Sequence, residues 1–184
     1  KEINFSRNKK NIFNIDFSNN LIFSRDLSKG SILSENNLEK FKEITIHKLR
    51  VLILCTGNSA RSQMGEGILK HLAGDRFEVF SAGTHPSTLN PYAVLAMAER
   101  GIDIREQYSK SLHKFLDKSF DYVITVCDRA AESCPIFPGP VTRIHWSFPD
   151  PAAVEGSHQE KLAAFIKVRD AIETNFVEWL SGFN

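Results

Sequence analysis

The strongest constraint in the sequence is a short apolar run that leads directly into a polar loop and then into a helical pattern. Residues 50–54 are apolar without alternation after the first, which predicts a strand buried on both faces of a parallel sheet. Residues 62–72 form a helical pattern that Gly74 would end, with apolar residues four apart at Met64, Ile68 and Leu72. The intervening loop should therefore lie at the end of a strand and at the N-terminus of a helix.

A loop in this position is suited to binding a tetrahedral oxyanion. Its backbone N–H groups can point inward, and the helix N-terminus adds partial positive charge, which we also expect to lower the pKa of the Cys55 thiol. Cys55 is then the nucleophile, and the planar guanidinium of Arg61 can hold two substrate oxygens. Ser62 can hydrogen-bond the thiolate, and Asn58 can brace the loop. The expected substrate-binding residues are Thr56, Gly57, Asn58, Ser59, Ala60, Arg61 and Ser62.

Strands alternate with helices from residue 48 onward, which predicts an α/β fold. Further strands are expected at 77–81, 122–126 and 141–145. Helices are expected from Pro91 to Gly101, more weakly at 111–116, and over a long final stretch. The buried stripe of the first of these helices should be Val94, Leu95 and Ala98, and that of the last Leu162, Phe165, Ile166, Ile172, Phe176, Trp179 and Leu180. The expected architecture is a small four-stranded parallel sheet with helices on both faces and a site beyond the carboxyl ends of its strands.

Composition narrows the partners and the compartment. The formal net charge is +1, from 23 basic and 22 acidic residues, so no large basic surface for nucleic acid or acidic lipid is implied. No apolar run approaches the roughly 20 residues that cross a bilayer, and the first 20 residues lack the apolar stretch of a secretory signal. We therefore expect a cytoplasmic protein with no membrane or nucleic-acid partner. The six histidines and three cysteines show no metal-type spacing, so neither a metal nor a cofactor is expected.

Composition also changes near residue 47, which predicts an N-terminal extension over 1–47 and a main domain over 48–184. The front segment contains eight Asn and six Ser, yet its Phe and Ile residues argue against a simple solvated tail. One interpretation is a strand pair and a short helix added to the main domain, or the remnant of a longer polypeptide. Another is a weak resemblance of residues 24–41 to the pattern of small SAF domains. The role of the extension stays open.

Two further cysteines and one aspartate are candidates for chemistry. Cys127 follows the third expected strand, so it should lie at the same sheet edge as the loop, while Cys134 lies in a polar segment bounded by prolines. In a cytoplasmic protein such thiols are more often reactive or buried than joined in a permanent disulfide. Asp150 precedes Pro151, where it can form a turn or act as an acid.

The segment VLILCTGNSARSQMGEG resembles the active-site loop of thioredoxin-coupled arsenate reductases, which are relatives of low-molecular-weight tyrosine phosphatases. The resemblance continues through SAGTHPSTLNPYAVLAMAERGIDI, VITVCDRAAESCP and HWSFPDPA, and covers about residues 49 to 181. It implies the phosphatase fold, arsenate as substrate, thioredoxin as electron donor, and a function in arsenic detoxification. It assigns loop roles to Cys55, Asn58, Arg61 and Ser62, the acid role to Asp150, and a disulfide relay to Cys127 and Cys134.

The chain departs from the pattern of these reductases at three positions. Ala60 stands where many relatives carry an additional loop cysteine, and Pro149 replaces the first acid of an Asp-Asp pair. Lys110 stands where potassium-stimulated reductases carry an aspartate ligand for the ion. We expect the Lys110 ammonium to take the place of that ion, near Asn58, Glu66 and Ser81.

Three functions remain open at this point. A reductase and a phosphatase both need the thiolate, the arginine and the acid, because both pass through an oxyanion bound to sulfur. The additional thiols favour an arsenate reductase, with weak phosphatase activity beside it, because a second thiol can release arsenite with two electrons. Ala152 also favours a reductase, since phosphotyrosine-hydrolysing relatives usually present an aromatic residue at that position. The alternatives are a low-molecular-weight tyrosine phosphatase and a noncatalytic oxyanion-binding or redox-sensing module.

The spacing of the relay cysteines predicts a movement. Residues 129–132 favour a helix, which would separate Cys127 and Cys134 by roughly 10 Å along its axis. A disulfide needs Cα atoms about 4.4 to 6.8 Å apart, so the segment would have to unwind on oxidation. The alternative is a permanently irregular loop that already holds the two sulfurs close together.

Overall fold

The computed structural model describes residues 2–8, 11–16, 21–26 and 48–183. The chain divides into two units, with the boundary in the sequence between residues 46 and 47. In the first unit, β1 (Glu2–Asn8), β2 (Asn11–Asp16) and β3 (Leu21–Asp26) form an antiparallel sheet in that order. The sequence predicted a strand pair here, and the sheet has a third strand. The expected short helix and most of the SAF-like pattern at 24–41 lie outside the described residues.

The second unit contains a four-stranded parallel sheet, as predicted. Its strands are β4 (Leu49–Cys55), β5 (Phe77–Gly83), β6 (Tyr122–Thr125) and β7 (Thr142–His145), in the order β5-β4-β6-β7. The sheet is built around β4, whose residues 51–54 are fully buried because strands pair with it on both sides and helices cover both faces. The parallel register aligns the carboxyl ends of all four strands at one edge of the sheet.

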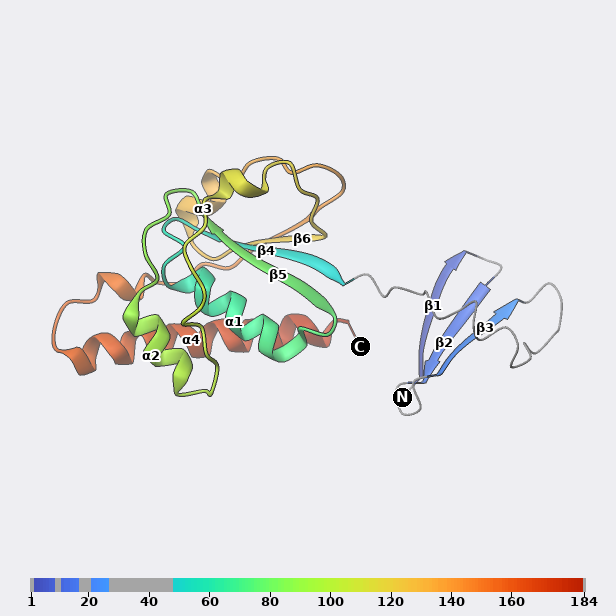
Figure 1. The fold of residues 1–184 in the computed structure, drawn as a ribbon, viewed down its shortest axis with the longest axis horizontal. Helices are drawn as coiled ribbons and strands as arrows, with labels where there is room; N and C mark the ends of the chain where they lie inside the picture. Colours follow the sequence, from blue (N-terminus) through green and yellow to red (C-terminus); the bar gives the residue numbers. More distant parts are fainter. Residues whose placement is uncertain (1, 9–10, 17–20, 27–47, 184) are drawn as a thin grey trace. The chain divides into compact units, whose positions relative to one another are not determined.

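Helices cover both faces of this sheet, which confirms the predicted fold class (Figure 1). One face carries α1 (Arg61–Ala73), α2 (Pro91–Ala98) and α4 (His158–Ser181), and the other carries α3 (Asp128–Glu132) and the 3-10 helix η2 (Leu112–Phe115). A second 3-10 helix, η3 (Pro151–Ala153), precedes α4. Side chains alternate between the two faces of the sheet along β5, so each face receives one aromatic ring of this strand. Phe77 packs on Trp179 of α4, and Phe80 packs on Phe115 of η2.

The helix boundaries follow local capping signals, whereas the orientation of α2 does not follow its predicted stripe. Asn90 caps α2 by accepting from the Tyr92 N–H, and Ser157 with Glu160 forms a capping box at the start of α4. The predicted stripe of α2 is wrong: Leu95 is 44% exposed, and the buried residues are Ala93, Ala96 and Met97. Two of these three buried residues are alanines, whose small side chains allow α2 and α4 to approach closely.

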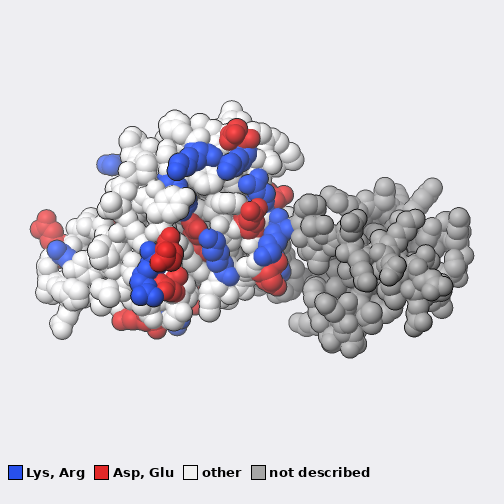
Figure 2. Space-filling view, viewed as in Figure 1, with Lys and Arg blue, Asp and Glu red and all other residues white. Residues whose placement is uncertain are grey.

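The surface of the main unit shows no broad area of one charge on the side seen in Figure 2, where acidic and basic side chains are interspersed over the described residues. Within the described part of the chain, none of the helices is long and apolar enough to span a bilayer.

Candidate active site

The polar loop lies between β4 and α1, as the sequence predicted. Cys55 is the last residue of β4, and α1 begins at Arg61. The loop forms one wall of a pocket of about 480 Å³ at the carboxyl edge of the sheet. The lining residues are Cys55, Thr56, Gly57, Ser59, Ala60, Arg61, Cys127, Asp128, Arg129, Asp150 and Ala152. Of the predicted substrate-binding residues, Asn58 and Ser62 are buried behind this lining.

The Cys55 sulfur receives hydrogen bonds from within the loop. The Asn58 N–H donates to Cys55 Sγ at 3.1 Å, and Ser62 Oγ lies 2.8 Å from the same sulfur. Asn58 Nδ2 donates to Ser62 Oγ at 2.8 Å, which leaves the Ser62 hydroxyl hydrogen free to point at Cys55. Each of these donors stabilises negative charge on the sulfur.

The expected lowering of the Cys55 pKa is nevertheless not what the structure shows. Burial raises the pKa of the Cys55 thiol, and the hydrogen bonds from Ser62 and Asn58 oppose this effect without overcoming it. The sulfur is the terminus of a strand that is buried on both faces, and desolvation of a thiolate there costs more than these donors return.

Asn58 braces the loop from beneath, as predicted. It has φ of 45°, a left-handed conformation that Asn tolerates better than most residues. Its Nδ2 also donates to Ser81 Oγ at 2.9 Å, and its Oδ1 accepts from the Lys110 N–H at 2.7 Å. The loop presses closely against Gly83, where an added Cβ would lie 2.6 Å from the Thr56 carbonyl oxygen. These contacts fix the position of the loop.

Lys110 contacts Glu66, one of the three residues expected near its ammonium. Its Nζ lies 3.2 Å from Glu66 Oε2, and both side chains are largely buried. Ser81 donates its hydroxyl hydrogen to the same carboxylate, and Lys70 pairs with the other carboxylate oxygen. An ammonium therefore supplies positive charge beside the loop. Within the described residues, no group of three or more His, Cys, Asp or Glu side chains could hold a metal ion.

Arg61 and Asp150 meet at the pocket. Arg61 Nη1 donates to the Phe148 carbonyl oxygen at 2.9 Å, and Nη2 lies 3.3 Å from Asp150 Oδ2. The other carboxylate oxygen of Asp150 accepts from the Ala152 N–H at 3.2 Å. Asp150 thus forms the expected turn and also presents a carboxylate to the pocket. Both of the roles considered for it are geometrically available.

Cys127 shares the pocket with Cys55, whereas Cys134 lies outside the lining. Thr56 Oγ1 lies 3.5 Å from Cys127 Sγ, and α3 begins directly after Cys127. The helix separates Cys127 from Cys134, which is partly buried, and all three cysteines are free thiols. The alternative of a permanently irregular segment is therefore wrong for residues 128–132. Burial raises the pKa of the Cys134 thiol, and the nearby charge of Arg143 opposes that effect.

The sequence reasoning missed two lining residues, Asp128 and Arg129. Hydrogen bonds from Ser147 and His145 lower the pKa of the Asp128 carboxyl. A signal was available, because both residues directly follow Cys127 at the carboxyl end of a strand, where parallel sheets place their sites. The pocket therefore contains two cations and two carboxylates around two thiols.

Residues 50–184 match the model of the family described as low molecular weight phosphotyrosine protein phosphatase. The chain belongs to this family. Within it, the chain is 50% identical over 122 residues to an arsenate reductase of Shouchella clausii, a match that covers 66% of this chain and 88% of the relative.

Solved structures of arsenate reductases are similar to this one. An arsenate reductase in the phosphate binding state has a TM-score of 0.60 and 28% identity, and the match covers 74% of this chain and 99% of that one. A thioredoxin-dependent arsenate reductase of Corynebacterium glutamicum has a TM-score of 0.56 and 28% identity, with 79% of this chain and 68% of that one covered.

Proposed function

We propose that this protein reduces arsenate to arsenite and serves in arsenic detoxification. The observation that carries the proposal is a second thiol, Cys127, in the oxyanion pocket of Cys55, with a third, Cys134, one short helix away. The arsenate reductases that resemble this chain support it. We further propose thioredoxin as the electron donor, because the Corynebacterium glutamicum protein is thioredoxin-dependent.

The first step is attack of the Cys55 thiolate on arsenic. Loop N–H groups and the Arg61 guanidinium hold the oxygens of arsenate, and Asp150 gives a proton to the departing oxygen, which leaves as water. The product is an arsenate ester of Cys55 in which arsenic is still As(V). Hydrogen bonds to the sulfur from Asn58 and Ser62 favour the thiolate that this step consumes.

The reduction occurs when Cys127 attacks the Cys55 sulfur. A Cys55–Cys127 disulfide forms, the sulfur–arsenic bond breaks, and its electron pair leaves with arsenic as arsenite, As(III). Cys134 then attacks Cys127, which frees Cys55 and forms a Cys127–Cys134 disulfide. Thioredoxin returns both thiols to the reduced state with two electrons and two protons.

A tyrosine phosphatase is the second candidate, because the same loop, arginine and acid hydrolyse phosphate esters. The pocket wall argues against an aryl substrate as the main one. Ala152 lines the pocket after Asp150 and Pro151, so no aromatic side chain at that position stacks on a substrate ring. Weak aryl-phosphate hydrolysis is expected as a side activity.

The test is arsenate-dependent NADPH consumption with thioredoxin and thioredoxin reductase, compared in the parent protein and in Cys127→Ser. Consumption in the parent and none in the variant supports the relay. Aryl-phosphate hydrolysis that survives in Cys127→Ser without any arsenate reduction in the parent identifies a phosphatase. Tight oxyanion binding with neither activity identifies a noncatalytic module.

The proposed compartment is the cytoplasm, where thioredoxin keeps thiols reduced. Residues 48–184 are proposed as the reductase domain and residues 1–47 as an extension outside it.

A further inference from the structure

Two side chains of the edge strand β7 contact opposite ends of residues 127–135, the relay segment, which contains Cys127 and Cys134. Arg143 Nη2 donates to the Pro135 carbonyl oxygen at 2.6 Å, directly after the second thiol. His145 Nε2 lies 3.1 Å from Asp128 Oδ1, directly after the first. Residues two apart on a strand project from the same face, so Arg143 and His145 reach the segment from one side of β7.

We propose that Arg143 and His145 are positioning residues of the disulfide relay. His145 anchors the start of α3 in both redox states. Arg143 is a latch that holds Pro135 in the reduced protein and releases it when Cys134 moves. The inference rests on the proposed relay and adds to it the contacts that control the movement.

The anchored end is fixed to the sheet. The Val126 N–H donates to the Leu54 carbonyl oxygen at 2.8 Å, which continues the strand pairing to the residue before Cys127. His145 Nδ1 lies 2.8 Å from Thr125 Oγ1. Since the Asp128 carboxylate only accepts hydrogen bonds, His145 Nε2 must carry the hydrogen between them. The imidazole thus ties the end of β6 to the first residue of α3.

The end of the relay segment near Cys134 is less firmly held, up to Phe137. Ile136 is 88% exposed, whereas Phe137 is 2% exposed and its ring packs edge-on against Phe120 at 5.6 Å between centroids. Rearrangement is therefore confined between Asp128 and Phe137. The contact of Arg143 with Pro135 lies inside this interval and is exposed to solvent, so it can break at modest cost.

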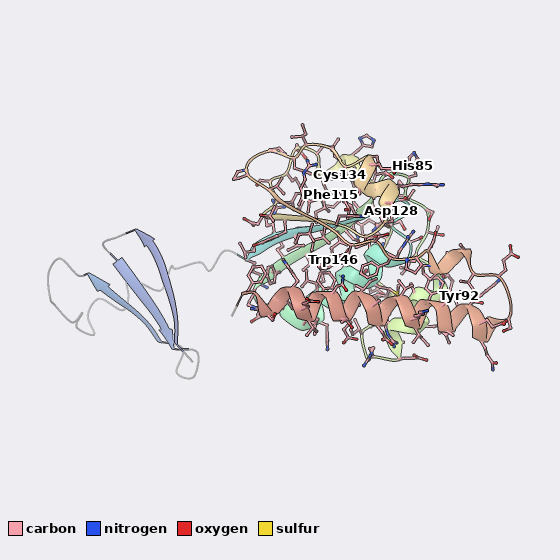
Figure 3. All side chains as sticks on the ribbon, turned by 180° about the vertical axis from the view of Figure 1, so that it is seen from behind. His85, Tyr92, Phe115, Asp128, Cys134 and Trp146 are labelled. Atoms are coloured by element: carbon pink, nitrogen blue, oxygen red, sulfur yellow. The ribbon has the colours of Figure 1, made fainter. Side chains whose placement is uncertain are left out.

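Figure 3 shows Asp128 and Cys134 together on the α3 side of the sheet, away from Trp146, which packs on α4. The relay segment therefore lies over one face of the sheet, and the long helix covers the other. Movement of Cys134 toward Cys127 does not require the packing of Trp146 on Phe176 to change. Arg143 and His145 therefore contact the relay segment on the α3 side of the sheet, opposite the long helix α4.

The latch is tested by the thiol–disulfide equilibrium of the full chain carrying Cys55→Ser, so that Cys127 and Cys134 are its remaining thiols. Oxidised dithiothreitol takes two electrons and two protons from the two thiols, giving the Cys127–Cys134 disulfide and reduced dithiothreitol. Because the Arg143 contact stabilises only the reduced form, Arg143→Ala should shift the equilibrium about threefold toward the disulfide. Arg143→Lys, which keeps a cationic donor, should restore most of the parent value.

A matched control is Arg105→Ala, since the Arg105 guanidinium binds Asp103 and not the relay segment. No shift with Arg143→Ala, while the disulfide forms normally, would overturn the latch alone. Absence of a Cys127–Cys134 disulfide in the parent would overturn the latch and the relay together. If Arg143→Ala does not fold by circular dichroism, Arg143→Gln takes its place with the same expected direction.

The anchor is tested with His145→Ala in the protein that retains Cys55. Arsenate reduction should fall about tenfold, while hydrolysis of para-nitrophenyl phosphate, which needs no relay, should stay within about twofold. An equal loss of both activities would show that His145 has only a structural role. If the parent protein hydrolyses the ester but does not reduce arsenate, the proposed function is wrong. The thiol–disulfide equilibrium with dithiothreitol would still show whether Arg143 stabilises the reduced form.

Discussion

Cys55 is the residue on which every proposed bond-forming step depends. Cys55→Ser should lower arsenate turnover by at least about 1000-fold, because a serine hydroxyl is a far weaker nucleophile and cannot enter a disulfide. Oxyanion binding should persist, since the loop N–H groups and Arg61 remain. Coupled NADPH oxidation gives the turnover, and calorimetric titration with phosphate gives the binding. Retained turnover in this variant would exclude Cys55 as the nucleophile.

Arg61 is expected to act through the shape of its side chain as well as its charge. Arg61→Lys should reduce kcat/KM roughly 100-fold, because an ammonium cannot reproduce the planar two-point contact with an oxyanion. The variant would also lose the geometry that joins Phe148 and Asp150. Steady-state kinetics with arsenate provides the measurement, and a near-normal rate with lysine would show that Arg61 does not hold the substrate.

Ser62 hydrogen-bonds Cys55, the proposed nucleophile, and this contact favours the thiolate. Burial raises the pKa of Cys55, so reactivity should increase as pH rises through that value. The Ser62 hydrogen bond lowers the pKa, and its loss in Ser62→Ala should raise the pKa further and slow alkylation of Cys55 by iodoacetamide at neutral pH. Ser181→Ala, at a surface serine bonded to Glu178, is the control. An unchanged pH profile in Ser62→Ala would show that the donor has no effect on the thiolate.

Among the elements, α1 is joined to the segment before η2 by the buried pair of Glu66 and Lys110. If the ammonium replaces an ion, potassium should stimulate turnover no more than sodium at matched ionic strength. Lys110→Ala should also lower the free energy of unfolding by about 1–2 kcal/mol, less than for an isolated buried pair, because Lys70 still contacts Glu66. Urea unfolding and kinetics in the two salts check the two parts, and specific potassium stimulation would contradict the first.

The regular elements of the main unit were predictable because each has a local cause. Buried parallel strands are continuous apolar runs, and the Asn90 side chain caps the start of α2 by accepting a backbone hydrogen bond. Which side of α2 faces the core was not predictable. Its sequence offers Leu95 and Ala96 as core residues almost equally, and only the approach of α4 decides that the small one faces inward.

The loop of the site was equally readable, since Cys55, Asn58, Arg61 and Ser62 lie within eight residues. The sequence did not predict the properties of the site that depend on the depth of burial or on strand register. The raised pKa of Cys55 reflects desolvation that no motif reports. The contact of His145 with Asp128 requires the parallel pairing of Thr125 with His145, which the sequence alone does not fix.

At the scale of the whole molecule, oxidation of the relay should alter one segment and leave the rest of the main unit unchanged. Cys127 is held at the sheet edge, and α3 keeps Cys134 too far away along its axis, at about 1.5 Å per residue, for a disulfide. Forming the Cys127–Cys134 bond must therefore unwind α3. Amide hydrogen exchange should show faster exchange over residues 128–138 in the oxidised protein than in the reduced protein.

The same measurement contains its own control, because β4, α1 and α4 lie outside residues 128–138. Their amides should exchange at the same rate in both redox states, since rearrangement is limited by the buried ring of Phe137 and by the strand pairing before Cys127. Equal protection of residues 128–138 in both states would eliminate the switch even if all three cysteines proved essential. Faster exchange throughout β4 and α4 would mean that oxidation loosens the whole domain, and that the relay is coupled to global stability rather than to one hinged segment.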